Sequence, residues 1–354
     1  MKAAIPNIRH LSLDELKQYF EQMGEKKFRA IQVYEWIWKQ HAHSFEAMTN
    51  LSNELRAKLT AHFLFPALQI ETTQYSADGT IKSRFKTFDN HMVEGVLIPT
   101  ESRHTACVSS QIGCSLSCKF CATGYMDRKR NLDFDEIYDQ VVLINQQTER
   151  VYNTKLKNIV FMGMGEPLLN YKNVLKAIER ISSPEGLHMS PRRITVSTAG
   201  VAKMIRQLGD DKVRFNLALS LHAANDIKRN EIMPINETNN IKALIEALNY
   251  FYKETGNEIT FEYILFQDFN DSIEDANELI KIYRQVPTHL VNIIEYNPID
   301  AAKFLKPDEE TVRNFMNHLA KNKVNAHLRR SRGKDIDAAC GQLANKDTIG
   351  ITAE

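Results

Sequence analysis

The sequence predicts an α/β protein whose core is a partial (β/α)6 barrel, preceded by a helical domain and a small antiparallel β-meander. Three observations predict this class. Apolar residues recur at helical spacing over the first 65 residues. In the following segment apolar residues occupy every second position, as in a β-strand. After residue 104 short β-rich runs alternate with helical ones. Repeated β-α units indicate a parallel sheet. Because no dinucleotide-binding glycine fingerprint accompanies them, a barrel is favoured over a doubly wound sheet.

Length and composition are those of a globular protein. The 354 residues suggest two domains, or one barrel-sized domain with an appendage, and the 43% hydrophobic and 25% charged residues exclude disordered and fibrous classes. The 45 Lys and Arg residues balance 44 Asp and Glu, so any nucleic-acid binding must come from local basic patches. No run of 18 apolar residues occurs and the N-terminus lacks a signal-peptide core. We therefore expect a cytoplasmic protein that does not contact membranes.

Residues 1–65 are predicted to form an N-terminal helical domain. Apolar residues at helical spacing begin near Leu16 and continue through residues 30–37 and 51–63. Three cations, Lys26, Lys27 and Arg29, are expected between the first two helices. They are interpreted as a solvated loop, the commoner case, or as contacts to phosphate groups.

Residues 66–103 are predicted to form the β-meander. Turn signals at Asp78 and Asp89 separate segments of alternating polarity, of which the second is residues 91–98. In that segment Glu94 shares a face with apolar residues. It is either a charge that protects an edge strand from aggregation, the commoner case, or a general base in a desolvated environment.

Residues 104–354 are predicted to form the barrel domain. Its six candidate strands are residues 105–110, 158–162, 193–197, 216–220, 259–265 and 289–296. Helical patterns lie near residues 133–149, 171–182, 201–208, 240–254, 272–284 and 309–321, and the last precedes a possible seventh strand at 324–330. Polar and glycine-rich motifs follow the strands directly, which is where barrel enzymes build their active sites.

The loop after the first barrel strand carries Cys114, Cys118 and Cys121 in a CxxxCxxC pattern. Three soft ligands without an obvious fourth suit a 4Fe-4S cluster with one open iron. Phe120 would pack over such a cluster. A zinc site remains an alternative, because Cys107 could supply a fourth thiolate, although the characteristic zinc spacing is absent.

These residues resemble a known superfamily. The cysteine pattern, with an aromatic residue before its third cysteine, and the segment Gly163 to Pro167 resemble the radical S-adenosylmethionine (SAM) enzymes, in which the open iron binds SAM and cleaves it to a 5'-deoxyadenosyl radical. Five longer segments, in order over nearly the whole chain, resemble the RlmN/Cfr family of RNA adenine methyltransferases. They are residues 107–111, 161–168, 220–223, 233–236 and 332–343.

The resemblance implies a mechanism with two further cysteines. C2 and C8 of adenine are electron-poor, so a direct displacement on the SAM methyl group fails and a radical is needed. By the family's mechanism Cys340 is methylated on sulfur by one SAM, and the radical from a second SAM activates that methyl group for addition to the ring. Glu94 matches the proton acceptor, and Cys107 then attacks Cys340 to leave a Cys107–Cys340 disulfide. The implied SAM contacts are Gly165, Glu166, Ser197, Ser220, Leu221, His222 and Asn297.

The resemblance also implies the partners. The first is 23S rRNA, which would be methylated at C2 of adenosine 2503, and the second is tRNA, which would be methylated at adenosine 37. The third is a reductant such as flavodoxin or a ferredoxin-type protein. We expect the protein itself to be a monomer. The N-terminal helices and basic clusters at residues 128–130, 192–193 and 329–334 are expected to bind RNA. The alternatives are methylation of C8 of the same adenosine by a Cfr-like enzyme and, in another class, a non-catalytic RNA-binding protein stabilised by zinc. A methylthiotransferase would need the cysteines of a second cluster.

Overall fold

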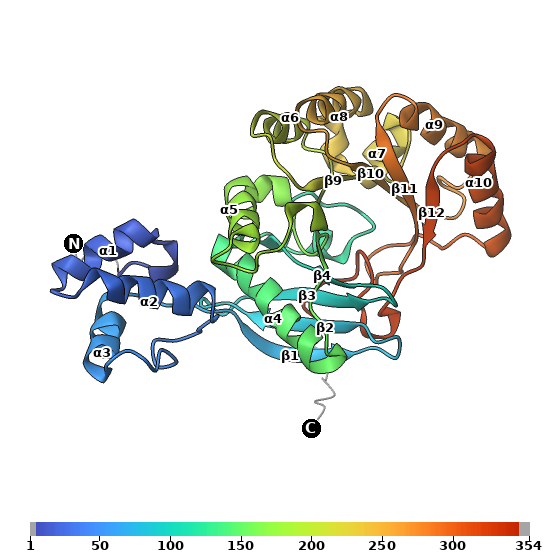
Figure 1. The fold of residues 1–354 in the computed structure, drawn as a ribbon. Coiled ribbons are helices and arrows are strands. Elements are labelled where there is room, and N and C mark those ends of the chain that lie inside the picture. Colours follow the sequence, from blue (N-terminus) through green and yellow to red (C-terminus); the bar gives the residue numbers. More distant parts are fainter. Residues whose placement is uncertain (1–4, 347–354) are drawn as a thin grey trace.

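The computed structural model of the protein describes residues 5–346 and has two parts. The smaller part contains the three predicted N-terminal helices, α1 (Leu13–Gln22), α2 (Lys27–Trp38) and α3 (Asn53–His62). Figure 1 shows them to one side of a larger α/β body that is built around one sheet. The first four and last eight residues of the predicted domains lie outside the described residues.

The helices begin where the sequence provides caps. Ser12 and Glu15 form a reciprocal capping box at the start of α1, and the Ser52 hydroxyl accepts a hydrogen bond from Leu55 N (3.2 Å) at the start of α3. Helix α2 has no side-chain cap and begins at Lys27. The prediction of a loop that contains all three cations is therefore wrong in part. Lys27 and Arg29 belong to the first turn of α2, and only Lys26 precedes it.

The meander and the barrel share one sheet, which differs from the separate small meander that the sequence predicts. Strands β1 (Gln69–Tyr75), β2 (Ile81–Lys86) and β3 (Met92–Pro99) are antiparallel. Strand β4 (His104–Cys107) pairs antiparallel with β3 on one edge and parallel with the next barrel strand on the other. Strand β3 is therefore central, and the interpretation of Glu94 as an edge-strand charge is wrong.

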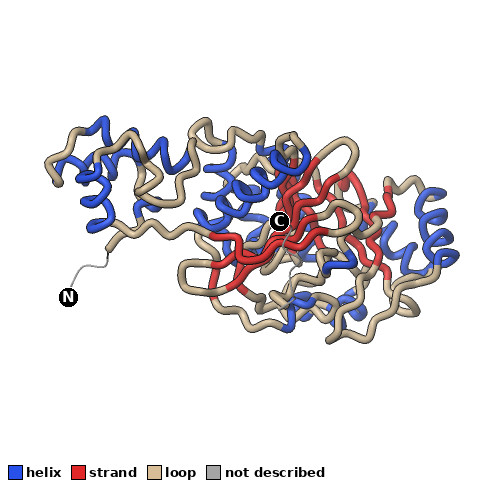
Figure 2. Tube along the Cα trace, turned by 90° about the horizontal axis from the view of Figure 1, so that it is seen from below, coloured by secondary structure: helices blue, strands red, loops and turns tan. Residues whose placement is uncertain are grey.

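The parallel strands follow one another in sequence order across the sheet. After β4 come β7 (Asn158–Phe161), β8 (Ile194–Thr198), β9 (Asn216–Ser220), β10 (Ile259–Leu265), β11 (Thr288–Glu295) and β12 (Ala326–Arg329), so the possible seventh strand is confirmed. Within residues 5–346 the first and last strands of this ten-stranded sheet do not pair with each other, as in a partial barrel. Figure 2 shows the strands as one continuous, curved layer.

The helices that alternate with these strands lie on the outside of the sheet (Figure 1). They are α4 (Phe134–Tyr152), α5 (Tyr171–Ser182), α6 (Ala202–Asp210), α8 (Ile241–Thr255), α9 (Ile273–Tyr283) and α10 (Glu309–Lys321), all predicted, and the short α7 (Asp226–Ile232), which was not. A small hairpin of β5 (Gln111–Ile112) and β6 (Arg130–Asn131) flanks the cysteine loop.

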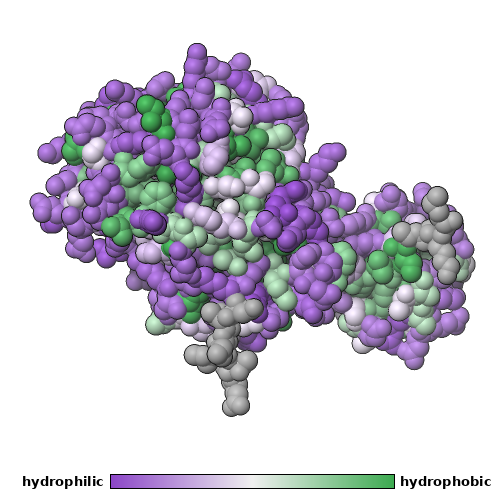
Figure 3. Space-filling view, turned by 180° about the vertical axis from the view of Figure 1, so that it is seen from behind, coloured by the Kyte–Doolittle hydropathy of each residue, from purple (hydrophilic) through white to green (hydrophobic). Residues whose placement is uncertain are grey.

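No helix within residues 5–346 combines the length and the apolar character needed to cross a membrane. Figure 3 shows one mostly hydrophilic face with scattered hydrophobic residues.

A buried ion-pair network joins the helical region to α4. Both terminal nitrogens of the Arg9 guanidinium bind the Asp139 carboxylate, at 2.6 and 2.5 Å, and Asp135 lies beside them. All three side chains are less than 5% exposed. Trp38 of α2 stacks on Phe134 with ring centroids 6.0 Å apart. This contact fixes the helical region against the barrel.

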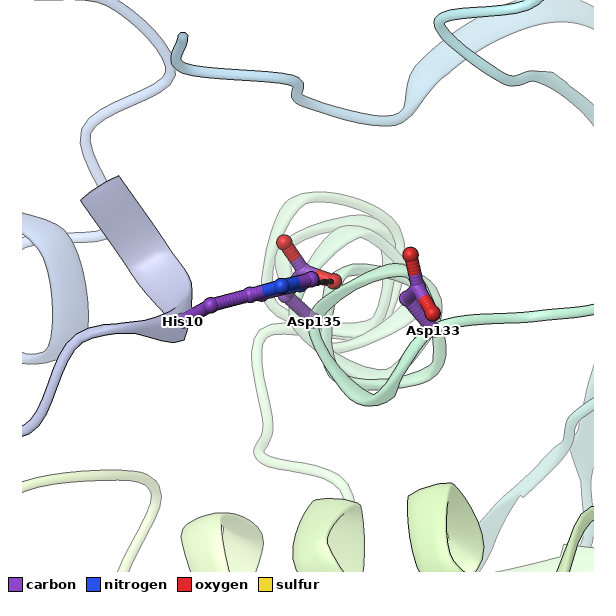
Figure 4. Close-up of side chains that lie close together, drawn as sticks. All are labelled: His10, Asp133 and Asp135. Carbon is purple, nitrogen blue, oxygen red and sulfur yellow. Dashed lines mark hydrogen bonds and ion pairs between the residues drawn. The ribbon is translucent and has the colours of Figure 1, made fainter. Parts of the chain in front are cut away.

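His10 extends the same joint. Figure 4 shows its ring directed at Asp135, with Asp133 at the start of the same helix, and His10 Nε2 lies 3.4 Å from Asp135 Oδ1. The other Asp135 oxygen accepts a hydrogen bond from Asn7 (3.0 Å). The hydrogen bond between His10 and the Asp135 carboxylate raises the pKa of His10. We interpret the group as an interdomain contact, because both oxygens of its buried carboxylate already have partners.

Candidate active site

The loops after the parallel strands enclose a cavity of about 150 Å³. It is lined by most of the residues that the sequence singles out, although they come from five separate segments of the chain. These residues are Cys114, Cys118, Cys121, Gly165, Glu166, Ser197, Ser220, His222 and Cys340. Cys107, Glu94, Leu221 and Asn297 do not line this cavity.

The three cysteines of the CxxxCxxC loop lie in an apolar pocket. Phe120 packs edge-on against the His222 ring with centroids 4.7 Å apart, and Met233 and Phe266 are buried in the same cluster. Burial raises the pKa of Cys114 to about 11, and burial likewise raises the pKa of Cys118 well above its usual value. Without metal these thiols are therefore protonated, and a metal would have to displace their protons.

The spacing of the sulfur atoms distinguishes between the metals proposed for this loop. A tetrahedral zinc ion with bonds of about 2.3 Å holds its thiolate ligands roughly 4 Å apart. Within residues 5–346 no three cysteine sulfurs lie within 4.8 Å of one another. In addition Cys107, the fourth ligand of the zinc alternative, lines a different cavity. Three cysteines around an open apolar pocket fit a larger iron-sulfur cluster better than they fit one zinc ion.

Glu166 follows β7 and its carboxylate is held by backbone amides. Leu168 N donates to one oxygen (3.0 Å) and Ala199 N to the other (2.7 Å), while Glu166 N donates to the Gln111 side chain (2.9 Å). Burial raises the pKa of Glu166, and the amide hydrogen bonds oppose that effect. The carboxylate lines the cavity without a cationic partner within residues 5–346, so it suits the ammonium group of an amino acid.

His222 follows β9 and offers one proton to the cavity. Its Nδ1 accepts a hydrogen bond from Ile264 N (3.1 Å), so the neutral ring must carry its proton on Nε2. Burial lowers the pKa of His222 to about 3, which keeps the ring neutral at physiological pH. Beside it the hydroxyls of Ser197 and Ser220 lie 3.3 Å apart. These groups can bind the polar atoms of a ligand without adding charge.

Asn297 and Leu221 lie just outside the cavity lining. The Asn297 amide donates to the Cys340 carbonyl (3.2 Å), and its Oδ1 is buried without a hydrogen-bond partner in the described chain. A buried acceptor without a donor is uncommon, and this oxygen is therefore free to accept a hydrogen bond from a ligand. The Leu221 side chain is buried in the core, and only its backbone faces the site region, where its carbonyl accepts from Arg229 (3.0 Å).

A second cavity of about 700 Å³ brings Cys107 and Cys340 together. Cys107 ends β4 and is buried, whereas Cys340 is half-buried and lines both cavities. Burial raises the pKa of Cys107 to about 12, and the negative charge of a Cys340 thiolate adds to that effect. The two cysteines thus share one space despite 232 intervening residues.

Arg329 and Glu262 also line both cavities and were not predicted as site residues. They form an ion pair at 3.4 Å, and the charge of Cys340 is the first cause that raises the pKa of Arg329. One signal was available in the sequence: Glu262 is a carboxylate in the apolar strand 259–265, the same feature that singled out Glu94. Arg329 appeared only as part of a basic cluster.

Glu94 is buried but lines neither cavity. Lys82 lies 3.3 Å from one carboxylate oxygen, and Ala344 N (2.9 Å) and Asn345 N (3.1 Å) donate to the other. The surroundings of Glu94 are therefore polar and charged, whereas the sequence had suggested an apolar environment. Glu94 binds the chain segment that carries Cys340, and the same segment contacts the cysteine loop, where Ala122 N donates to Gly341 O (2.7 Å).

The comparisons with known proteins agree with this geometry. Residues 108–280 match the family described as Radical SAM superfamily, and residues 6–64 match the Ribosomal RNA large subunit methyltransferase N-terminal domain. The fold and the three-cysteine site thus define a radical SAM enzyme, the class whose cofactors are a 4Fe-4S cluster and SAM. A probable dual-specificity RNA methyltransferase RlmN from Cytophaga hutchinsonii is 59% identical over 96% of this chain and 93% of its own.

Two further relatives extend the comparison. A protein of the same name from Bacillus licheniformis is 40% identical over 97% of this chain and 94% of its own. The crystal structure of a radical SAM methyltransferase from Sphaerobacter thermophilus superimposes with a TM-score of 0.89 at 40% identity, and covers 96% of this chain and 99% of its own. The chain belongs to the RlmN family of radical SAM RNA methyltransferases.

Proposed function

We propose that the protein methylates C2 of adenosine 2503 in 23S rRNA and of adenosine 37 in tRNAs through a methyl group carried on Cys340. The observation that carries this proposal is the position of Cys340, which lines both the cavity of the three cysteines and the cavity that contains Cys107. A methyl group on the Cys340 sulfur would lie between a radical source and a space large enough for a nucleobase.

The residues of the first cavity would hold the cofactors. Cys114, Cys118 and Cys121 would ligate the cluster, and Glu166 would bind the ammonium group of SAM. The other SAM contacts would be Gly165, Ser197, Ser220, Leu221, His222 and Asn297. When bound, the cluster and SAM supply a methyl group and a 5'-deoxyadenosyl radical, with two SAM molecules used per turnover. The buried Asn297 Oδ1 without a donor supports the assignment.

The two remaining cysteines would carry the methyl group and release the product. The Cys340 thiolate would attack the methyl carbon of one SAM and release S-adenosylhomocysteine. After that methyl group has lost a hydrogen atom to the radical, its carbon would bond to C2 of the adenine, and the adduct would lose the C2 proton and pass one electron to a one-electron acceptor such as the oxidised cluster. Attack by Cys107 on the Cys340 sulfur then forms an S–S bond and breaks the S–C bond, whose electron pair stays on the methylene carbon and is protonated. An external dithiol must reduce the Cys107–Cys340 disulfide before the next turnover.

Glu94 is proposed as the acceptor of the C2 proton. Its support is the pair of hydrogen bonds to Ala344 and Asn345, which place it beside the Cys340 segment. The partners proposed are rRNA, tRNA and a flavodoxin or ferredoxin-type reductant. We place the activity in the cytoplasm and assign it to a monomer. The proposed domains are the helical residues 1–65, the meander 66–103 and the barrel 104–354.

The test is anaerobic incubation of cluster-reconstituted protein with SAM, reductant and unmethylated 23S rRNA or tRNA, followed by mass spectrometry of the nucleosides. We expect 2-methyladenosine, and none from Cys340→Ala. If 8-methyladenosine forms instead, the regiochemistry is that of the Cfr-like branch and our assignment of C2 is wrong. Bound zinc and no methylated adenosine would support the non-catalytic alternative.

A substitution at Gly165 tests the cofactor site. Gly165 has φ of +90°, and a Cβ there would lie 2.4 Å from Gln111 Cβ, whose side chain holds Glu166 N. We expect Gly165→Ala to weaken SAM binding by roughly tenfold or more, because about 1–3 kcal/mol of strain would displace Glu166. Gly256→Ala is the control, since Gly256 also has positive φ but no atom within 4 Å of a Cβ. Equal SAM affinities, measured by calorimetry, would contradict the assignment.

A further inference from the structure

The wall and mouth of the second cavity are basic. Five exposed arginines contribute to its lining. Arg332 donates a hydrogen bond to the Asp78 carbonyl (3.3 Å), and the other four are Arg103, Arg192, Arg193 and Arg330. They come from separate parts of the chain: the turn before β4, the turn before β8 and the residue after β12. The fold therefore gathers cations that are far apart in the sequence around one space.

These arginines have no carboxylate partner within residues 5–346. Two acidic residues line the cavity, Glu258 and Glu262, and Glu262 is already paired with Arg329. Four free guanidinium groups at the wall of one cavity produce a local positive potential, although the net charge of the whole chain is only +1. Such a potential attracts phosphate groups.

The basic cluster beside the cysteine loop differs from this one. Arg130 binds both Asp89 and Glu136 through pairs of hydrogen bonds of 2.7–2.8 Å, and Lys129 lies 3.6 Å from Asp127. Arg128 donates to Asn131 (2.9 Å). The charges of Arg130 and Lys129 are thus neutralised locally, so that the cluster has less capacity to bind phosphate than its sequence suggests.

The cavity also has the right size and contents for a nucleotide. Its volume of about 700 Å³ lies within the range of small-molecule sites, roughly 300–1,000 Å³. Cys107 and Cys340 are part of its lining, whereas the cysteine loop lines only the first cavity. A base that enters here would reach Cys340 through a space that the cysteine loop does not line.

We propose that Arg103, Arg192, Arg193 and Arg330 bind the phosphates of an RNA loop whose target nucleotide is extruded into the second cavity and reaches Cys340 from there. The inference rests on the proposed function and adds the route and the contacts of the substrate. A nucleotide must leave its stack to be modified at a ring carbon, and phosphates on both sides of it need cationic partners.

The test compares RNA binding by two double variants. Arg192→Ala/Arg193→Ala should weaken binding of a tRNA transcript by roughly tenfold or more and reduce the slope of log K against log salt by about 1 to 2. Lys129→Ala/Arg206→Ala is the matched control, because Lys129 lies 3.6 Å from Asp127 and Arg206 lies 3.3 Å from Glu246, and it should bind within about threefold of the unmodified protein. Arg192→Lys/Arg193→Lys should restore most of the binding, because the positive charges remain.

Methylation of the Cys340 sulfur by SAM, measured on the intact protein, separates this proposal from the proposed function. It needs no RNA and should be the same in all these variants. Unchanged RNA binding in Arg192→Ala/Arg193→Ala, or an equal loss in the control, would overturn the route. If the unmodified protein yields no methylated adenosine while these arginines still control binding, the proposed chemistry fails and the RNA contact stands.

Discussion

Cys107→Ala is expected to trap the protein on its RNA. Cys107 and Cys340 line the same cavity, and in the proposed chemistry only the Cys107 sulfur can break the bond between Cys340 and the methylated base. Of the two cysteines, only Cys340 is needed for the steps that form that bond. The variant should therefore still methylate Cys340, consume RNA once and stop, so that product released per enzyme falls to background.

Denaturing gel electrophoresis measures this outcome directly. A band of protein attached to RNA should accumulate with Cys107→Ala and disappear after ribonuclease treatment, and mass spectrometry should place the linkage at Cys340. Cys340→Ala is the control and should form no such band. Free methylated RNA from Cys107→Ala in repeated turnovers would show that another group resolves the adduct.

Arg9→Ala is expected to be among the most destabilising single substitutions. Arg9 binds Asp139 at 2.5 Å and lies beside Asp135, and all three side chains are buried. Its removal leaves the buried Asp139 carboxylate without a cation, which typically costs about 3 to 5 kcal/mol. Arg206→Ala is the matched control, because the Arg206–Glu246 pair is exposed and such pairs contribute about 0 to 1 kcal/mol.

Tryptophan fluorescence can report this effect selectively. The two tryptophans of the chain, Trp36 and Trp38, both lie in α2, and Trp38 packs on Phe134 at the joint. In urea, the fluorescence transition of Arg9→Ala should move to lower concentration than the circular-dichroism transition of the whole protein. Coincident transitions at the midpoint of the unmodified protein would show that the ion-pair network does not hold the joint.

The order of the elements could be predicted from the sequence because each strand and helix has its own periodicity. The seventh strand and the six long barrel helices follow from local patterns alone. The pairing of β3 with β4 could not be predicted, because register between segments depends on contacts that a local pattern does not contain. The helix start at Lys27 was missed for a related reason, since α2 has no side-chain cap.

The candidate site could be predicted where its residues directly follow strands. Cys114, Glu166 and His222 meet in one cavity because the carboxyl ends of parallel strands share one side of the sheet. Arg329 could not be predicted in this way, because its position depends on the pairing of β12 with β11. The contacts of Glu94 could not be predicted either, because they depend on how the segment after β12 folds back across the meander. That return is visible in the hydrogen bonds from Ala344 and Asn345 to Glu94.

The central claim is that the methyl group reaches RNA by way of Cys340. The most direct measurement preloads Cys340 from SAM labelled with carbon-13 in its methyl group, removes the free cofactor, and adds unlabelled SAM, reductant and RNA for a single turnover. We predict that the methyladenosine formed in this turnover carries carbon-13, and that the label leaves Cys340 at the same rate. Unlabelled methyladenosine, with carbon-13 still on Cys340, would contradict the account.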